Sequence, residues 1–313
     1  MSRAFVFPGQ GSQTVGMGKA LAEAMPEARH LFQEVDEALQ QNLSRLMFEG
    51  PMEELTLTEN AQPALMAVSL AVIRVLEKDG GLDLSSQASF VAGHSLGEYS
   101  ALCAARTLPL DVTARLLKRR GQAMQAAVPV GLGAMAALLG LDLEAAKAVA
   151  RDAAQGEVCD VANDNATGQV VVSGHATAVE RAVELAKERG ARRPMLLPVS
   201  APFHCALMAP AADVMGEALA ESTLLAPVVP LVANVTAEAV SDPERIRELL
   251  VEQVTRTVRW RESVGYMKEA GVDTLVEIGA GKVLTTMLKR IDPDLSGRAV
   301  GTPEDIEAFV AAQ

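Results

Sequence analysis

The sequence has 313 residues, of which 49% are hydrophobic and 22% charged, a balance typical of a folded globular chain rather than a disordered one. Its formal net charge of -12 and its aromatic content of only 3% argue against nucleic-acid binding, which depends on Lys, Arg and stacking aromatic side chains. The three cysteines, Cys103, Cys159 and Cys205, show no metal-ligand spacing and predict reduced thiols in the cytoplasm.

Strand-like and helical runs alternate along most of the chain. Short apolar runs predict strands at 4–7, 90–92, 231–233 and 274–278, with helices between them. One such helix, 60–76, carries no charge before Arg74 and is expected to be buried on most sides. This alternation predicts an α/β fold in which helices cover both faces of a parallel sheet.

A different order of elements follows between residues 130 and 198. The expected elements, in the order βαββαβ, are 134–139, 143–154, 158–162, 170–173, 177–189 and 195–198. This order is the plan of a ferredoxin-like α+β subdomain. We therefore expect 130–198 to be a small subdomain inserted into a larger catalytic one made of 1–129 and 199–313.

One uncharged run, 121–141, is long enough to cross a membrane. Pro129, Gly131 and Gly133 interrupt it, so a helix end, a turn and a strand are predicted there instead. The N-terminus also lacks the apolar stretch of a signal peptide. We expect no membrane association.

The segment 93–97, Gly-His-Ser-Leu-Gly, fits the pattern Gly-x-Ser-x-Gly between a predicted strand and a predicted helix. Its two glycines permit a tight turn from which Ser95 projects, and the following helix N-terminus offers backbone N–H groups to an oxyanion. The pattern predicts a nucleophilic serine. The alternative is a glycine-rich turn with a capping serine.

A nucleophilic serine needs a base, and four histidines are available: His30, His94, His175 and His204. His30 is expected on the surface, His175 at a helix start, and His94 in structural support, because neighbouring side chains on an elbow point apart. His204, in the loop 200–205, remains by elimination; the alternative is a helix-terminal histidine without chemistry. No Asp or Glu is placed to complete a triad, which favours a Ser–His dyad oriented by a neutral acceptor.

Arg120 falls on the apolar face of the predicted helix 112–127. A guanidinium there costs several kcal/mol unless it is paired. Its partner is either an acidic side chain from another element or a substrate carboxylate held by the planar fork. The residues alone leave both possibilities open.

Together these motifs resemble the malonyl-CoA:acyl carrier protein transacylase family. The matching segments, in the family's order, are 7–13, 93–97, 120–121, 200–205, 251–254 and 277–282. The last departs from the family's usual Gly-Pro-Gly turn at Ala280, which bears on turn rigidity more than on chemistry. The resemblance covers nearly the whole chain and implies a hydrolase-like sheet with helices on both faces.

The resemblance implies that a malonyl group passes from malonyl-CoA to the phosphopantetheine thiol of acyl carrier protein. The implied mechanism is ping-pong through a malonyl ester of Ser95, with His204 as general base and with no metal or redox cofactor. It also implies that the backbone carbonyl of Gln253 orients the histidine, so that the Gln253 side chain is expected to be dispensable.

The resemblance assigns the remaining site residues as well. The backbone N–H groups of Gln10 and Leu96 would form the oxyanion hole. Arg120 would bind the malonyl carboxylate, and Phe203 would favour malonyl over methylmalonyl groups by crowding the α-carbon.

Two other function classes share parts of this pattern. A serine hydrolase has the same elbow, but it would need a carboxylate partner for the histidine and no buried arginine. A catalytically silent carrier-binding module would need neither Ser95 nor His204. We expect a monomer. The resemblance implies an acidic carrier protein, and this chain is acidic too, so docking must rely on a local basic surface. The expected surface is the dense basic cluster 187–193, and the cluster 256–261 is the competing one.

Overall fold

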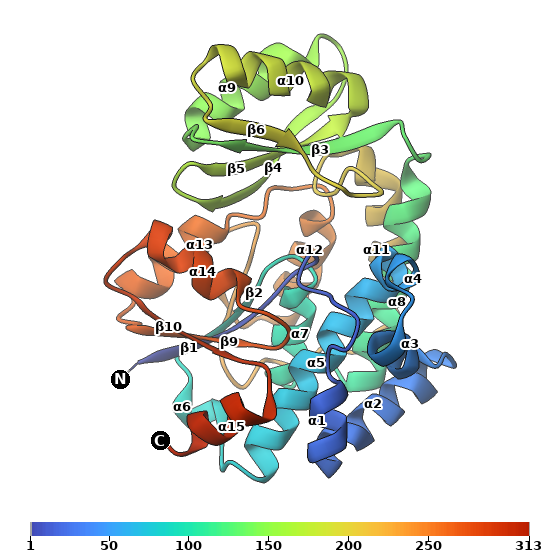
Figure 1. The fold of residues 1–313 in the computed structure, drawn as a ribbon, viewed down its shortest axis with the longest axis vertical. Coiled ribbons are helices and arrows are strands. Elements are labelled where there is room, and N and C mark those ends of the chain that lie inside the picture. Colours follow the sequence, from blue (N-terminus) through green and yellow to red (C-terminus); the bar gives the residue numbers. More distant parts are fainter. Residues whose placement is uncertain (1, 313) are drawn as a thin grey trace.

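The computed structural model describes residues 2–312 and contains a mainly parallel sheet and a separate antiparallel sheet (Figure 1). The strands of the larger sheet are β1 (Arg3–Phe7), β2 (Phe90–Gly93), β7 (Leu231–Val232), β8 (Ala239–Val240), β9 (Thr274–Ile278) and β10 (Ser296–Val300). Their spatial order is β10-β9-β1-β2-β7-β8. All neighbours pair in parallel except β7 and β8. The predicted α/β fold is confirmed.

The four strands predicted for this sheet occur within a residue of their expected bounds. Two strands were not predicted from the sequence. β8 has only two residues, and β10 begins with Ser, Gly and Arg, so neither shows an apolar run. Both lie at edges of the sheet, where fewer side chains need to be buried.

Helices surround the larger sheet on both faces. Those that precede the insertion are α1 (Lys19–Ala24), α2 (Pro26–Leu39), α3 (Leu43–Glu49), α4 (Met52–Thr56), α5 (Thr58–Lys78), α6 (Leu84–Gln87), α7 (Gly97–Ala104) and α8 (Leu110–Ala127). Those that follow it are the 3-10 turn Ala206–Met208, α11 (Ala209–Ala220), α12 (Pro243–Gln253), α13 (Trp260–Glu269), α14 (Val283–Ile291) and α15 (Pro303–Val310).

Successive side chains of the central strands enter different cores, because they point to opposite faces of the sheet. Phe5 and Phe7 of β1 join the core that includes α5, α7 and α8. Ala4 and Val6 join the core under α13 and α14. The central helix α5 is buried along most of its length, as its lack of charge predicts.

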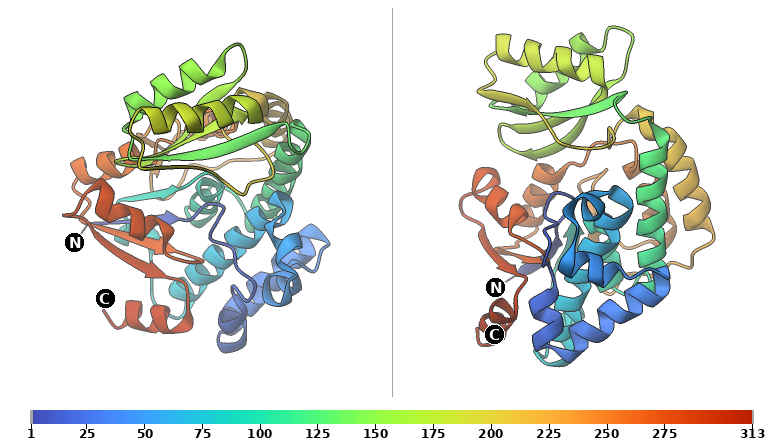
Figure 2. Two further views of the ribbon diagram at one scale, coloured as in Figure 1. Left: turned by 45° about the horizontal axis from the view of Figure 1, so that its top comes forward. Right: turned by 45° about the vertical axis from the view of Figure 1, so that its right-hand side comes forward.

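A smaller unit lies between α8 and the 3-10 turn. Its elements are β3 (Gly133–Leu139), α9 (Leu143–Ala154), β4 (Cys159–Ala166), β5 (Gln169–His175), α10 (Ala176–Glu188) and β6 (Arg193–Leu196), in the predicted order βαββαβ. The strands form an antiparallel sheet in the order β4-β5-β3-β6. Figure 2 shows α9 and α10 on the side of this sheet that faces away from the larger unit. Between 121 and 141 the chain forms the predicted helix end, turn and strand. None of the helices within residues 2–312 combines the length and apolar character that a membrane crossing needs.

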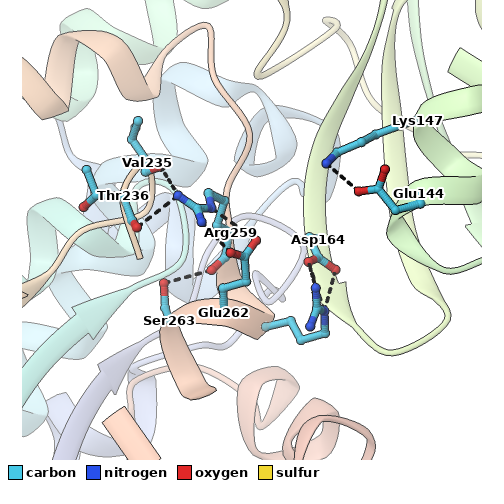
Figure 3. Close-up of polar contacts among 9 residues, drawn as sticks. Glu144, Lys147, Asp164, Val235, Thr236, Arg259, Glu262 and Ser263 are labelled. Carbon is cyan, nitrogen blue, oxygen red and sulfur yellow. Dashed lines mark hydrogen bonds and ion pairs between the residues drawn. The ribbon is translucent and has the colours of Figure 1, made fainter. Parts of the chain in front are cut away.

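Strand β4 joins the smaller unit to the larger one. The backbone N–H of Asp164 donates to the carbonyl of Val258, whose own N–H donates to the carbonyl of Ala162. The Asp164 side chain is 1% exposed and forms an ion pair of 2.8 Å with Arg261. Figure 3 shows Asp164 on its strand, close to the segment that carries Arg259 and Glu262. These contacts place the smaller unit directly above the carboxyl ends of β1 and β2.

Candidate active site

The turn between β2 and α7 has no room for side chains at its two glycines. A Cβ atom at Gly93 would lie 1.9 Å from the carbonyl carbon of Gly97, and one at Gly97 would lie 2.2 Å from the carbonyl oxygen of Phe7. Ser95 between them has a φ of 54°, a left-handed conformation that non-glycine residues seldom adopt. Such strain is tolerated where surrounding contacts fix it, and it is frequent at active sites. The sequence pattern therefore forms the predicted elbow.

His204 lies beside Ser95. Its Nε2 is 2.8 Å from Ser95 Oγ, and its Nδ1 is 2.8 Å from the backbone carbonyl oxygen of Gln253. A carbonyl oxygen can only accept, so Nδ1 carries the proton and Nε2 has a free lone pair for the serine hydroxyl. No carboxylate within residues 2–312 contacts this imidazole. The geometry is the dyad that the sequence analysis expected.

Burial first, and the positive charge of Arg120 second, lower the pKa of His204 to about 3. The imidazole is therefore neutral at physiological pH, the form in which it can accept a proton. His204 itself has a φ of 58°, so both members of the dyad have left-handed backbones.

The loop after β1 lies against the elbow. A Cβ atom at Gly9 would lie only 2.7 Å from the carbonyl oxygen of His94, and the N–H of His94 donates to the carbonyl of Phe7 at 3.0 Å. This close contact brings the loop that carries Gln10 against His94, the residue before Ser95. Within the described part of the chain, the backbone N–H of neither Gln10 nor Leu96 donates a hydrogen bond to another group.

Arg120 is 1% exposed and points at the nucleophile. Its guanidinium donates to three neutral acceptors, Ser95 Oγ at 3.2 Å, Gln62 Oε1 at 2.8 Å and Gln253 Oε1 at 2.7 Å. Its Nε is buried without a partner. Because Arg120 forms no ion pair within residues 2–312, the alternative of an acidic partner from another element is wrong. Arg120 therefore remains able to bind a carboxylate.

The other three histidines do not contact Ser95 Oγ. His94 is hydrogen-bonded through Nε2 to Asn165 Oδ1 at 2.8 Å, and its ring packs against Trp260. His175 accepts a hydrogen bond from the N–H of Val158, and His30 is exposed. Phe203, which precedes His204, is 8% exposed.

Sequence reasoning missed the side chains that support this dyad. Asn234 Oδ1 accepts from the Ser95 N–H at 2.8 Å, and its Nδ2 donates to the Gly93 carbonyl at 2.6 Å, so it holds both ends of the elbow. The Gln253 side chain contacts Arg120, a contact that the sequence analysis did not anticipate. Gln62, one of the polar residues in a mainly apolar stretch of α5, was a signal that the sequence offered.

The chain was compared with known families, proteins and structures. The family model described as "Acyl transferase domain" matches residues 4–294. The malonyl CoA-acyl carrier protein transacylase of Bacillus subtilis is 48% identical over 308 residues, covering 98% of this chain and 96% of that protein.

Solved structures agree with these relatives. An acyl-carrier-protein-S-malonyltransferase from Bartonella henselae superposes with a TM-score of 0.97 at 58% identity, covering 100% of this chain and 99% of the other. A chain from the structure of a type II PKS acyl-carrier protein in complex with its malonyl-transacylase superposes with the same TM-score at 43% identity, and the match covers 100% of both chains.

The fold and the Ser–His pair, together with the matching family model, define an acyltransferase, which decides against a hydrolase and against a catalytically silent module. More specifically, the chain belongs to the malonyl-CoA:acyl carrier protein transacylase family.

Proposed function

We propose that this chain transfers the malonyl group of malonyl-CoA to the phosphopantetheine thiol of acyl carrier protein. The observation that carries the proposal is the position of Ser95 Oγ, 2.8 Å from the His204 base and 3.2 Å from the Arg120 guanidinium. A nucleophile with a base on one side and a buried cation on the other suits an acyl group that ends in a carboxylate. The names of its relatives support the same substrates.

In the first half-reaction Ser95 Oγ attacks the thioester carbon while its proton passes to Nε2 of His204. Collapse of the tetrahedral intermediate breaks the C–S bond, and the CoA thiolate leaves with the proton from Nε2. The products are CoA and a malonyl ester of Ser95. The imidazole is neutral again, and the Gln253 carbonyl has held its Nδ1–H throughout.

In the second half-reaction the carrier thiol gives its proton to His204 Nε2 and attacks the ester carbon. The C–O bond to Ser95 breaks, and the serine oxygen recovers the proton from Nε2. Each half-reaction passes through an oxyanion, for which we propose the N–H groups of Gln10 and Leu96 as donors. The freedom of both N–H groups from other hydrogen bonds and the position of Leu96 at the N-terminus of α7 support this role.

We assign Arg120 two effects on the acyl group. It binds the malonyl carboxylate, and that carboxylate in turn offsets the positive charge that helps to lower the pKa of His204. The base therefore accepts a proton more readily when a malonyl group is bound than when an acetyl group is. Phe203, beside the base, would limit substituents on the α-carbon.

The proposal includes the architecture that the sequence predicted. Residues 130–198 would be a ferredoxin-like subdomain, which its strand order β4-β5-β3-β6 and its βαββαβ succession support. Residues 1–129 and 199–313 would form the hydrolase-like catalytic subdomain. A monomer in the cytoplasm stays a prediction.

The charges favour one of the two basic clusters as the carrier-protein surface. In the 256–261 cluster, Arg259 is paired with Glu262 and Arg261 with Asp164 (Figure 3). In the 187–193 cluster, Lys187 and Arg189 are paired with Glu184 and Asp152. Arg192 and Arg193 of that cluster, however, are exposed and form no ion pair within the described residues. An acidic partner gains most from unpaired cations, so we propose that it docks beside β6.

Intact-mass measurement tests the proposal. Incubation with malonyl-CoA should give a malonyl adduct on Ser95, which the Ser95→Ala variant cannot form. Addition of phosphopantetheinylated carrier protein should then remove the adduct and yield malonyl carrier protein. The proposal fails if no adduct forms, or if water removes the adduct as fast as the carrier protein does.

A further inference from the structure

Glu98 is a buried carboxylate to which the mechanism above gives no role. It lies in the first turn of α7, three residues after the nucleophile, and is 1% exposed. It forms no ion pair within residues 2–312. Burial raises its pKa to about 7, so its charged form exists near neutral pH in an unfavourable environment. Such a cost points to a function that an apolar residue could not perform.

The contact of Glu98 fixes the orientation of the Gln253 amide. Gln253 Nε2 donates to Glu98 Oε2 at 2.6 Å and to the backbone carbonyl oxygen of Ser95 at 2.9 Å. Both partners are acceptors, so they hold the NH₂ group of the amide on their side. The amide oxygen is consequently turned toward Arg120 Nη2, at 2.7 Å. A reversed amide would place an NH₂ group against the guanidinium and an oxygen against two acceptors.

The Gln253 side chain also separates the carboxylate of Glu98 from the guanidinium of Arg120. A direct Glu–Arg pair would be bidentate and would occupy the fork that a substrate carboxylate needs. With the amide between them, Arg120 is held by the neutral oxygens of Gln62 and Gln253. The Glu98 carboxylate, whose negative charge compensates the buried cation, then lies on the far side of the Gln253 amide.

We propose that Glu98 is a positioning residue that, through the Gln253 side chain, holds Arg120 in the orientation that recognises an acyl carboxylate. This inference rests on the proposed function, because it concerns the selection of malonyl over acetyl groups. Glu98 does not touch the reacting atoms. Its effect should therefore be seen in selectivity, not in the chemistry common to both acyl groups.

The first test replaces Glu98 with methionine, which has a similar size and whose sulfur is only a weak acceptor. Adduct formation at Ser95 is followed with malonyl-CoA and with acetyl-CoA. In Glu98→Met the ratio of the malonyl to the acetyl kcat/KM should fall roughly tenfold, the scale of coupling within a hydrogen-bonded network. Glu98→Gln retains an acceptor oxygen and should keep the ratio within roughly threefold of the wild type. Equal loss with both substrates, an unchanged ratio in Glu98→Met, or a failure of Glu98→Gln to rescue it would each overturn the inference.

A second variant keeps the inference testable if Glu98→Met does not fold. Gln253→Met removes the side-chain amide but keeps the backbone carbonyl that binds His204, and it should lower the ratio in the same way. Adding Glu98→Met to Gln253→Met should lower the ratio no further, because the two side chains act in series, with Glu98 acting on Arg120 only through the Gln253 side chain. Where Glu98→Met does not fold, Glu98→Ala, which also removes the acceptor, takes its place. Multiplicative effects would show that Glu98 acts by another route and would refute the series arrangement.

Glu77→Met is the matched control. Glu77 is a partly buried carboxylate on α5, 15 residues after Gln62, and therefore about 22 Å along the helix from the arginine site. Its replacement should leave the ratio unchanged, and a drop equal to that of Glu98→Met would count against a specific role. The wild-type enzyme separates the two proposals. If it forms no malonyl adduct, the proposed function fails; if it does and the Glu98 variants keep its selectivity, only this inference fails.

Discussion

Replacing Arg120 by alanine should change which acyl group the enzyme accepts more than it impairs the chemistry. The guanidinium is buried, contacts Ser95 Oγ and is free of any carboxylate partner in the described structure. Without it, a malonyl carboxylate would enter a buried site that offers only neutral amides. An acetyl group lacks that charge and loses nothing comparable.

The expected size follows from these contacts. Loss of one partner from a buried, charge-assisted pair costs about 2–4 kcal/mol. At 1.36 kcal/mol for each factor of ten, the malonyl kcat/KM should fall roughly 30- to 900-fold. The acetyl rate should hold or rise, because Arg120 is one of the causes that lower the pKa of His204. Removing this cation makes the base stronger.

The assay is the rate of adduct formation at Ser95 with malonyl-CoA and with acetyl-CoA, measured by intact mass. Arg119→Ala is the matched control: this neighbouring arginine is partly exposed and has only long contacts, 3.6 and 3.7 Å, to Glu217 and Glu221. It should leave both rates close to wild type. Equal losses with both substrates in Arg120→Ala, with the melting temperature retained, would refute the reasoning and make Arg120 a structural residue.

Three further predictions use the same enzyme. Ser95→Ala and His204→Ala should each remove nearly all adduct formation by intact mass, and substantial activity without the imidazole would contradict the dyad. Because the pKa of His204 is about 3, its Nε2 stays unprotonated above that pH, so malonyl acylation between pH 8 and 5 should show no loss with a midpoint near 6.5. A midpoint there that persists in Glu98→Gln would contradict this assignment. Replacing both Arg192 and Arg193 by Glu should raise the KM for carrier protein but should not slow the malonyl-CoA half-reaction, and an unchanged KM would exclude this surface. Wild-type turnover with carrier protein should also weaken as salt is added, since exposed charges are screened within about 10 Å at 0.1 M.

Tertiary structure changed two interpretations that the residues had left open or incomplete. Arg120 could have had an acidic partner, and only the folded structure shows that the amides of Gln62 on α5 and Gln253 at the end of α12 take that place. From the sequence, the denser 187–193 cluster is the expected surface for a partner and 256–261 is the competing one. Arg259 pairs with Glu262, three residues further along the chain, whereas Arg261 pairs with Asp164 of the smaller unit, a partner that is distant in sequence.

The sequence by itself predicted most of the elements and singled out Ser95 and His204, which the fold brings together. Local patterns suffice where neighbouring residues set the backbone: apolar runs for β1, β2 and β9, the order βαββαβ for the smaller unit, and the glycines that leave Ser95 on a tight turn. The sequence could not determine what surrounds Ser95. Gln62, Asn234 and Gln253 come from three segments far apart in the chain, and the amide of Gln253 takes its orientation from Glu98. Hydrogen-bond direction in a buried network depends on every partner at once, so only the folded arrangement decides it.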